Sequence, residues 1–181
     1  MNRKLRWVTE TAVMLALLVA LQALTKPMGQ LVTGSFVNCI LAVTTLVAGV
    51  SSGVTVAVIS PLLAYLLGIA PQILTVPVIM VGNGLYVVLL WLIAGKGGRK
   101  PGRQLLGWLA ASVGKFAALY AMVVWLICGV LAQRLLSSGL LKEPMLKVLP
   151  ATFSWPQLIT ALIGGGAALL IVPVLKKALH Q

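Results

Sequence analysis

Acidic residues are almost absent from this chain. Its 181 residues include two carboxylates, Glu10 and Glu143, and one histidine, His180. Paired carboxylates for acid–base chemistry, a Ser-His-Asp triad and a metal site of His, Asp and Glu ligands cannot be assembled from so few groups. The sequence therefore predicts no catalytic residue, no metal and no cofactor, and it disfavours an enzyme.

Charge of either sign is also scarce. Only 9% of the residues are charged, compared with about a quarter in soluble domains, and 60% are apolar. This composition, with a mean hydropathy of +1.08, predicts an integral membrane protein. The net charge of +12 does not indicate nucleic-acid binding, because the basic residues cluster at the ends of apolar segments, as membrane topology requires. The two cysteines, Cys39 and Cys128, lie within apolar segments and have no metal-ligand spacing.

Six apolar segments follow one another along the chain. They predict an all-α integral membrane protein, a single bundle of six transmembrane helices over residues 9–24, 36–50, 54–69, 73–94, 104–133 and 154–175. Glycine, proline and polar residues predict connections at residues 25–35, 51–53, 70–72 and 95–103. The stretch 134–153 mixes charges with leucines, and we expect it to include a short helix in the membrane interface.

Basic residues are unevenly distributed about these spans. An even number of spans places both termini on one side, and that side receives nine of the basic residues while the other receives four. The nine are Arg3, Lys4, Arg6, Lys96, Arg99, Lys100, Arg103, Lys176 and Lys177, and the four are Lys26, Arg134, Lys142 and Lys147. The positive-inside rule therefore predicts cytoplasmic termini.

Alanine recurs at every fourth position of the first span, at Ala12, Ala16 and Ala20. On a helix this spacing leaves a stripe of small residues down one face, and such a face lets another helix approach closely in lipid. The stripe is compatible with docking of a partner protein and equally with packing against the chain's own helices. The spacing alone does not decide between the two.

The segment from Leu109 to Ala132 contains a single ionisable residue, Lys115. A cation inside a membrane span costs about 2.5 kcal/mol or more, so it requires a partner or a ligand. Its position near mid-membrane exceeds the reach of a lysine stem, about 6 Å, and argues against snorkelling to the interface. Two accounts remain: a structural pair with helix carbonyls or with Asn83, and a binding site for a ligand with an anionic or strongly accepting group. The lack of an acidic residue as a permanent ion-pair partner in the spans favours the ligand.

Asn83 is the second costly polar group. It lies in the run Gly82-Asn83-Gly84 at the centre of the fourth span, roughly 15 Å deep. Because Asn83 and Lys115 lie at similar depth, we expect them to share a cavity. Aromatic residues with polar tips suit the walls of such a pocket, and they equally suit packing or the membrane interface. The candidates are Tyr86, Tyr120, Trp125 and Trp155.

Three stretches carry a family resemblance: LVTGSFVN (Leu31–Asn38), Val81-Gly82-Asn83 and FSWPQLITALIGG (Phe153–Gly165). Together with six spans in 181 residues, cytoplasmic termini and the alanine stripe, they make the whole chain similar to the substrate-binding S-components of bacterial energy-coupling factor (ECF) vitamin transporters. The resemblance implies a protein of the bacterial cytoplasmic membrane that captures a small vitamin-like substrate with high affinity.

The resemblance also implies partners and a site. In the family, the first-helix motif matched here by Ala12, Ala16 and Ala20 docks a membrane-embedded coupling (T) subunit, which two cytoplasmic ATPases drive. The substrate site lies toward the outer face, the loop between the first two helices acts as a gate, and the subunit topples in the membrane to release its substrate inside. Here that loop is residues 25–35, with Gln30 and Thr33 as the implied contacts. The predicted topology places two further candidates, Trp155 and Gln157, near the outer face.

No substrate-specific signature identifies the vitamin, but Lys115 suggests a carboxylate, a phosphate or a ring with strong acceptors. The alternative function is a stand-alone secondary transporter or channel. Such proteins usually carry a titrating acid or an ion site in their spans, and the near absence of Asp and Glu disfavours proton coupling.

Overall fold

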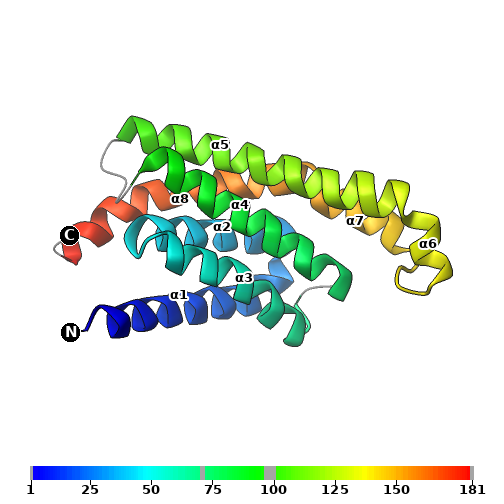
Figure 1. Cartoon of the computed structure of the whole chain (residues 1–181), viewed down its shortest axis with the longest axis horizontal. Coiled ribbons are helices and arrows are strands. Elements are labelled where there is room, and N and C mark those ends of the chain that lie inside the picture. The colour runs from blue at the N-terminus through cyan, green and yellow to red at the C-terminus, as the bar shows by residue number, and fades with distance from the viewer. Residues whose placement is uncertain (1, 70–71, 96–100, 180–181) are drawn as a thin grey trace.

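The computed structural model describes residues 2–69, 72–95 and 101–179, and the regular elements in these ranges are all helices (Figure 1). In chain order they are α1 (Arg3–Thr25), η1 (Lys26–Met28), α2 (Gln30–Val47), α3 (Val50–Leu66), η2 (Ile73–Thr75), α4 (Val76–Ala94), α5 (Pro101–Leu119), η4 (Tyr120–Val130), α6 (Ala132–Ser137), α7 (Met145–Phe153) and α8 (Trp155–Ala178). The predicted turn at residues 70–71, the basic residues 96, 99 and 100, and His180 lie outside the described residues.

Most of these helices are built to cross a membrane. Five described stretches are long and apolar enough: Arg3–Met28, Gln30–Val47, Ile73–Ala94, Pro101–Val130 and Met145–Ala178. The remaining apolar helix, α3, has 17 residues and is about 26 Å long, against a bilayer core of about 30 Å. The start of α1 and the end of α8 lie at the same end of the bundle (Figure 1). The prediction of an all-helical membrane protein is confirmed, with α3 shorter than a full span.

Two of the predicted connections were wrong. Residues 30–35 form the first turns of α2, and Ser51–Gly53 lie in the first turn of α3. The chain turns instead at Gly29 and Gly49, whose φ angles are 87° and 98°. Each connection needs one residue in this left-handed region, which glycine adopts without strain. The other residues stay helical because backbone groups in an apolar surrounding are best satisfied within a helix.

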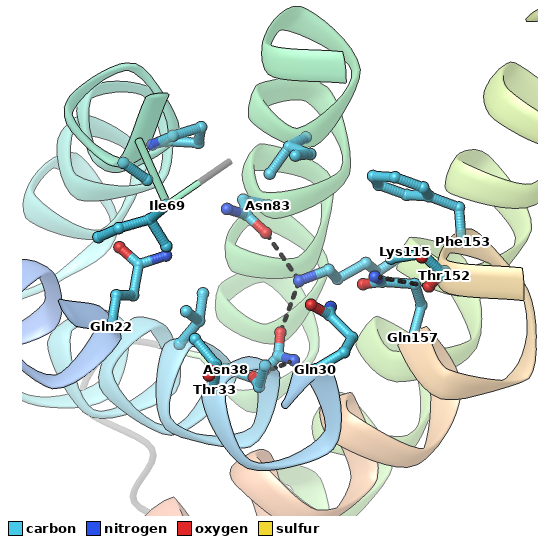
Figure 2. Close-up of a pocket in the computed structure, with 15 residues that line it drawn as sticks. Gln22, Gln30, Thr33, Asn38, Ile69, Asn83, Lys115, Thr152, Phe153 and Gln157 are labelled. Atoms are coloured by element: carbon cyan, nitrogen blue, oxygen red, sulfur yellow. Dashed lines mark hydrogen bonds between the residues drawn. The ribbon is translucent and has the colours of Figure 1, made fainter. Parts of the chain in front are cut away.

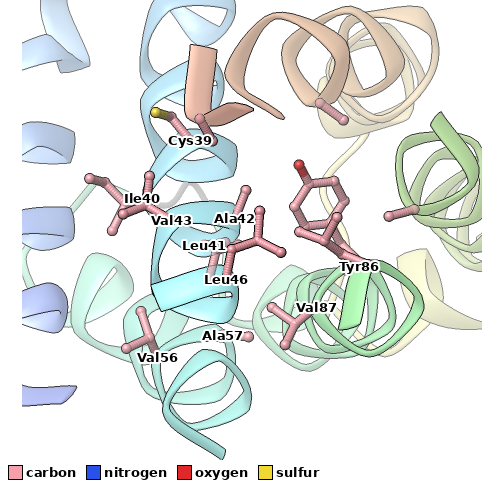
Figure 3. Packing of buried hydrophobic residues seen from close by; sticks show 14 of the residues in the cluster. Cys39, Ile40, Leu41, Ala42, Val43, Leu46, Val56, Ala57, Tyr86 and Val87 are labelled. Atoms are coloured by element: carbon pink, nitrogen blue, oxygen red, sulfur yellow. The ribbon is translucent and has the colours of Figure 1, made fainter. Parts of the chain in front are cut away.

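Helix α2 is the centre of the bundle. It packs against α1, α3, α4 and α8, most extensively against α8, and residues 38–46 are buried without interruption. Figure 3 shows Leu41 and Leu46 among side chains of the neighbouring helices, including Val56 of α3 and Val87 of α4. A helix that is largely apolar and has no charged residue, as α2 does, is expected in such a central position. The bundle is therefore organised around α2.

Glycines bring α8 very close to α2. A Cβ on Gly164 would lie 2.8 Å from the backbone nitrogen of Cys39, and a Cβ on Gly34 would lie 2.9 Å from Cγ2 of Thr160. Helices in lipid associate through such close packing of small residues, since lipid supplies no hydrophobic driving force between them. The contact fixes the first turns of α8 beside the first turns of α2, where the polar residues described below lie.

The predicted loop of residues 134–153 holds two short helices, α6 and α7. Helix α7 packs against η4, whose hydrogen bonds have π-helical spacing, as from the Leu131 nitrogen to the Leu126 oxygen at 2.8 Å. The contact belongs to a second apolar cluster that contains Leu119, Val123, Ile127, Leu141, Leu149 and Phe153. This cluster holds α7 against the bundle at the end opposite the termini (Figure 1).

Helix α1 lies at the edge of the bundle (Figure 1). Only 17% of the residues in its apolar window are buried, compared with 56% in α2. Leu18 points inward and is 1% exposed, whereas Ala12, Ala16 and Ala20 are all exposed. The alanine stripe therefore does not serve as a packing face against the described helices, and that interpretation of its spacing is wrong.

Replacing Gly164 with alanine is expected to lower the thermal unfolding temperature of the detergent-purified protein, because the new methyl group would meet the backbone of α2. Overpacking of this kind costs about 1–3 kcal/mol. Gly84→Ala is the matched control, since nothing lies within 4 Å of a Cβ at that position. Equal melting temperatures for the two variants would contradict the role assigned to the α2–α8 contact.

Candidate binding site around a buried lysine

The side chain of Lys115 lies between three helices. It projects from α5, is 3% exposed, and its Nζ donates hydrogen bonds of 2.7 Å to Oδ1 of Asn38 on α2 and of 2.7 Å to Oδ1 of Asn83 on α4 (Figure 2). Hydrogen bonds from an ammonium are stronger than those between neutral groups, and they offset part of the cost of burying the charge. The expectation that Lys115 and Asn83 share a site is confirmed, and Asn38 joins them.

The Asn38 amide is held in place by its own helix and by α8. Its Nδ2 donates to the Gly34 oxygen at 2.8 Å and to Thr160 Oγ1 at 3.3 Å. Thr160 Oγ1 in turn donates to the Gln157 oxygen at 3.1 Å. Because the amide nitrogen is engaged by α2's own backbone and by Thr160 of α8, the Asn38 oxygen is directed toward Lys115. A polar network thus joins α5 to α8 through α2.

Tyr86 lies beneath the lysine. Its ring centroid is 5.7 Å from Lys115 Nζ, within the range of a cation–π interaction, and the residue is fully buried in the main apolar cluster. The ring stabilises the ammonium from the core side. Tyr86 was predicted as a cavity wall. In the structure it contacts Lys115 but does not itself line the cavity.

A cavity of about 120 Å³ opens beside Lys115. One buried water requires roughly 10–15 Å³ on this measure, so the space holds several waters or a compact organic molecule. Its polar lining consists of side chains from six helices: Gln22, Gln30, Thr33, Asn38, Asn83, Lys115, Thr152 and Gln157. Gln22 lies near the end of α1, Gln30 begins α2 and Gln157 lies near the start of α8, so the cavity occupies the half of the bundle away from the termini.

The structure brings together five of the nine residues named as candidate contacts or cavity walls. The five that line the cavity are Lys115, Asn83, Gln30, Thr33 and Gln157, and Gln157 Nε2 donates to the Thr152 oxygen at 3.1 Å (Figure 2). That these residues bind a substrate stays a prediction.

Three other predicted residues lie elsewhere, and one of them, Trp125, is exposed and does not line the cavity. Trp155 is 66% exposed and stacks on Phe116 with ring centroids 5.5 Å apart. Tyr120 is 45% exposed, and its ring centroid lies 5.9 Å from that of Phe116. Neither lines the cavity. Tyr120 follows Phe116 by four residues, so the two rings share one face of α5 and η4, and Trp155 of α8 stacks on Phe116 at that face. Sequence position gave their depth but not the direction of their side chains.

Sequence reasoning missed Asn38, Gln22 and Thr152. Asn38 carried the same signal as Asn83, an amide within an otherwise apolar span, and an amide buried in a membrane requires a partner. Gln22 was likewise the lone amide of the first span. Thr152 lies in the stretch predicted as a loop and gave no signal of its own.

The electrostatics of the site are one-sided. Lys115 supplies a positive charge, and its two partners are neutral amides. Of the two acidic residues, Glu10 pairs with Arg6 at 2.7 Å near the start of α1, and Glu143 lies exposed between α6 and α7. In the described part of the chain, no three His, Cys, Asp or Glu residues come together as metal ligands would. The groups present can bind and orient a molecule that offers hydrogen-bond acceptors.

Comparison with known proteins gives one match. The model of a protein family described as ECF transporter, substrate-specific component, matches residues 9–176. No curated protein and no solved structure matches the chain. The matched range contains the alanine stripe, the lysine and all the residues that line the cavity.

Asn38→Leu keeps a similar side-chain volume but leaves Lys115 with one amide acceptor, and it should destabilise the protein by about 1–3 kcal/mol. Thr152→Val is the matched control. It alters the same cavity, but removes only a hydroxyl that bonds the Val148 oxygen of its own helix at 2.8 Å. Thermal unfolding in detergent compares the two. A melting temperature for Asn38→Leu that equals the control's would show that the lysine does not depend on this partner.

Proposed function

This chain belongs to the substrate-specific components of ECF transporters, and we propose that it is the high-affinity capture subunit for a vitamin-like small molecule. Family membership implies a non-catalytic specificity subunit that works with a membrane-embedded T subunit and ATPases. The observation that carries the proposal is the polar cavity around Lys115, which lies away from the termini and is lined by polar side chains from six helices. Concave sites with a few convergent polar groups are typical of small-molecule binding.

The distribution of charge supports an orientation for capture. Basic residues gather at the start of α1 and the end of α8, which lie at the same end of the bundle (Figure 1). The positive-inside rule favours this end for the cytoplasm of a bacterial cell. The cavity then faces the outside, where a nutrient first meets the membrane, and the ATPases act from the opposite side.

The exposed alanine stripe supports docking through α1. Ala12, Ala16 and Ala20 form a smooth surface on the least buried of the long helices, on residues that the bundle does not cover. Small residues allow the backbone of a partner helix to come close, which is the usual source of helix association in lipid. The proposed docking surface is thus separate from the cavity.

A tagged full-length chain purified from its native membranes is expected to recover a coupling subunit and two ATPases. Ala16→Trp should reduce their recovery by about tenfold or more, because the indole would hold a partner helix away from the stripe. Val113→Trp is the matched control, since Val113 is also exposed, at 55%, but lies on α5.

Two outcomes would contradict the proposal. One is a purification that never recovers these partners. The other is proton- or sodium-dependent uptake by liposomes that contain this chain alone, which would make it a stand-alone transporter.

Lys115→Ala is expected to reduce the small molecule retained through purification by about tenfold or more while expression stays normal. The substitution removes the bonds to the ligand together with those to Asn38 and Asn83. The freed asparagine oxygens face a cavity that water can enter, so the fold is expected to tolerate the change. Native mass spectrometry measures retention, and size-exclusion chromatography measures folding. Unchanged retention would remove the ligand role, and loss of folded protein would make the lysine structural.

A further inference from the structure

The Lys115 ammonium has hydrogen-bond acceptors but no acidic residue beside it among the described residues. Amide oxygens accept two of its hydrogen bonds, yet they carry no net charge, and neither Glu10 nor Glu143 is among the residues that line the cavity. A buried cation without a counter-ion is costly, and the cost falls when an anion binds beside it. The site therefore attracts a negative ligand group and repels a positive one.

The geometry leaves room for that anion. An ammonium has three protons, and two of those on Lys115 are directed to the two asparagines. The Tyr86 ring lies on the core side of the Lys115 nitrogen. The Lys115 side chain itself lines the cavity. The cavity is thus the open direction around Nζ (Figure 2).

The Gln22 amide is a second polar group at the cavity, on the side formed by α1. Gln22 enters the cavity from α1, and its Oε1 is buried without a hydrogen-bond partner among the described residues. An unsatisfied buried amide costs free energy, and a ligand group that bonds it recovers that cost. In Figure 2 the Gln22 and Lys115 side chains approach the cavity from different sides.

The volume limits the ligand. About 120 Å³ is small beside the roughly 300–1,000 Å³ of pockets for drug-sized molecules. We propose that this cavity selects a compact molecule with one net negative charge, whose anionic group accepts the remaining proton of the Lys115 ammonium while a second polar group bonds the Gln22 amide. This inference rests on the proposed function and specifies its substrate class.

The first test uses the full chain in detergent, incubated with a small-molecule extract of its host cells, washed and analysed by mass spectrometry of the released compounds. One retained compound with a single negative charge at neutral pH is expected. A neutral or cationic compound would overturn the inference but leave substrate capture intact. Retention of nothing would contradict the proposed function itself.

The second test compares the retained acid with its uncharged carboxamide or ester. The wild type should bind the acid about tenfold or more tightly than the neutral analogue, and Lys115→Met should bind the two equally. Equal binding by the wild type, or a preference that survives in Lys115→Met, would overturn the charge assignment.

Two further variants separate charge from fold. Asn83→Asp places a carboxylate where Lys115 already has a 2.7 Å contact, so it should weaken binding of the acid about tenfold or more relative to binding of the neutral analogue. Binding of that analogue shows that the variant is folded. Gln22→Leu should weaken both ligands alike, by about two- to tenfold. Full affinity for the acid in Asn83→Asp would overturn the role of charge, and full affinity in Gln22→Leu would overturn the second contact.

Discussion

The ammonium of Lys115, bonded at 2.7 Å to the side-chain oxygens of both Asn38 and Asn83, is the interaction on which the site depends. Lipid cannot solvate a buried cation, and here two other helices supply the acceptors. This requirement fixes the rotation of α2, α4 and α5 about their axes. Through the second amide bond of Asn38 to Thr160 it also involves α8, at the place where glycines let α8 approach α2. Polar solvation and close packing therefore support the same arrangement.

The two faces of α1 connect this site to the rest of the proposed function. The inward face brings Gln22 to the cavity, and the outward face carries the exposed alanine stripe. Ligand capture needs a polar, pre-organised interior, whereas helix docking in lipid needs a smooth and small-sided exterior. A single helix at the edge of the bundle meets both needs. The distribution of basic residues adds a direction, with the cavity at the end opposite the positively charged helix ends (Figure 1).

Sequence reasoning reached the class of fold and the centre of the site because both follow from strong energies. Scarcity of charge predicts a membrane protein, and a lone lysine at mid-membrane predicts a polar partner at the same depth. Sequence reasoning failed for features that depend on small energy differences, such as the exact turn residue and the rotation of a helix about its axis. More than one glycine lies in or beside each of these connections. Gly29 and Gly49 form the turns, whereas Gly34 and Gly53 lie within helices where neighbouring side chains approach closely. Depth along a span does not give rotation, so Trp155 and Tyr120 were assigned to a cavity that their rings do not reach, while Asn38 was left out. The exposure of the alanine stripe could be learned only from the packed bundle.

The most direct measurement is an experimental structure of the full chain purified with its natural ligand in place. The account predicts a compact molecule in the cavity, with an acceptor atom about 3 Å from Lys115 Nζ and with both asparagine oxygens still bonded to the same nitrogen. A ligand bound elsewhere in the bundle, or one that occupies the cavity while Lys115 contacts the two amides alone, would contradict it.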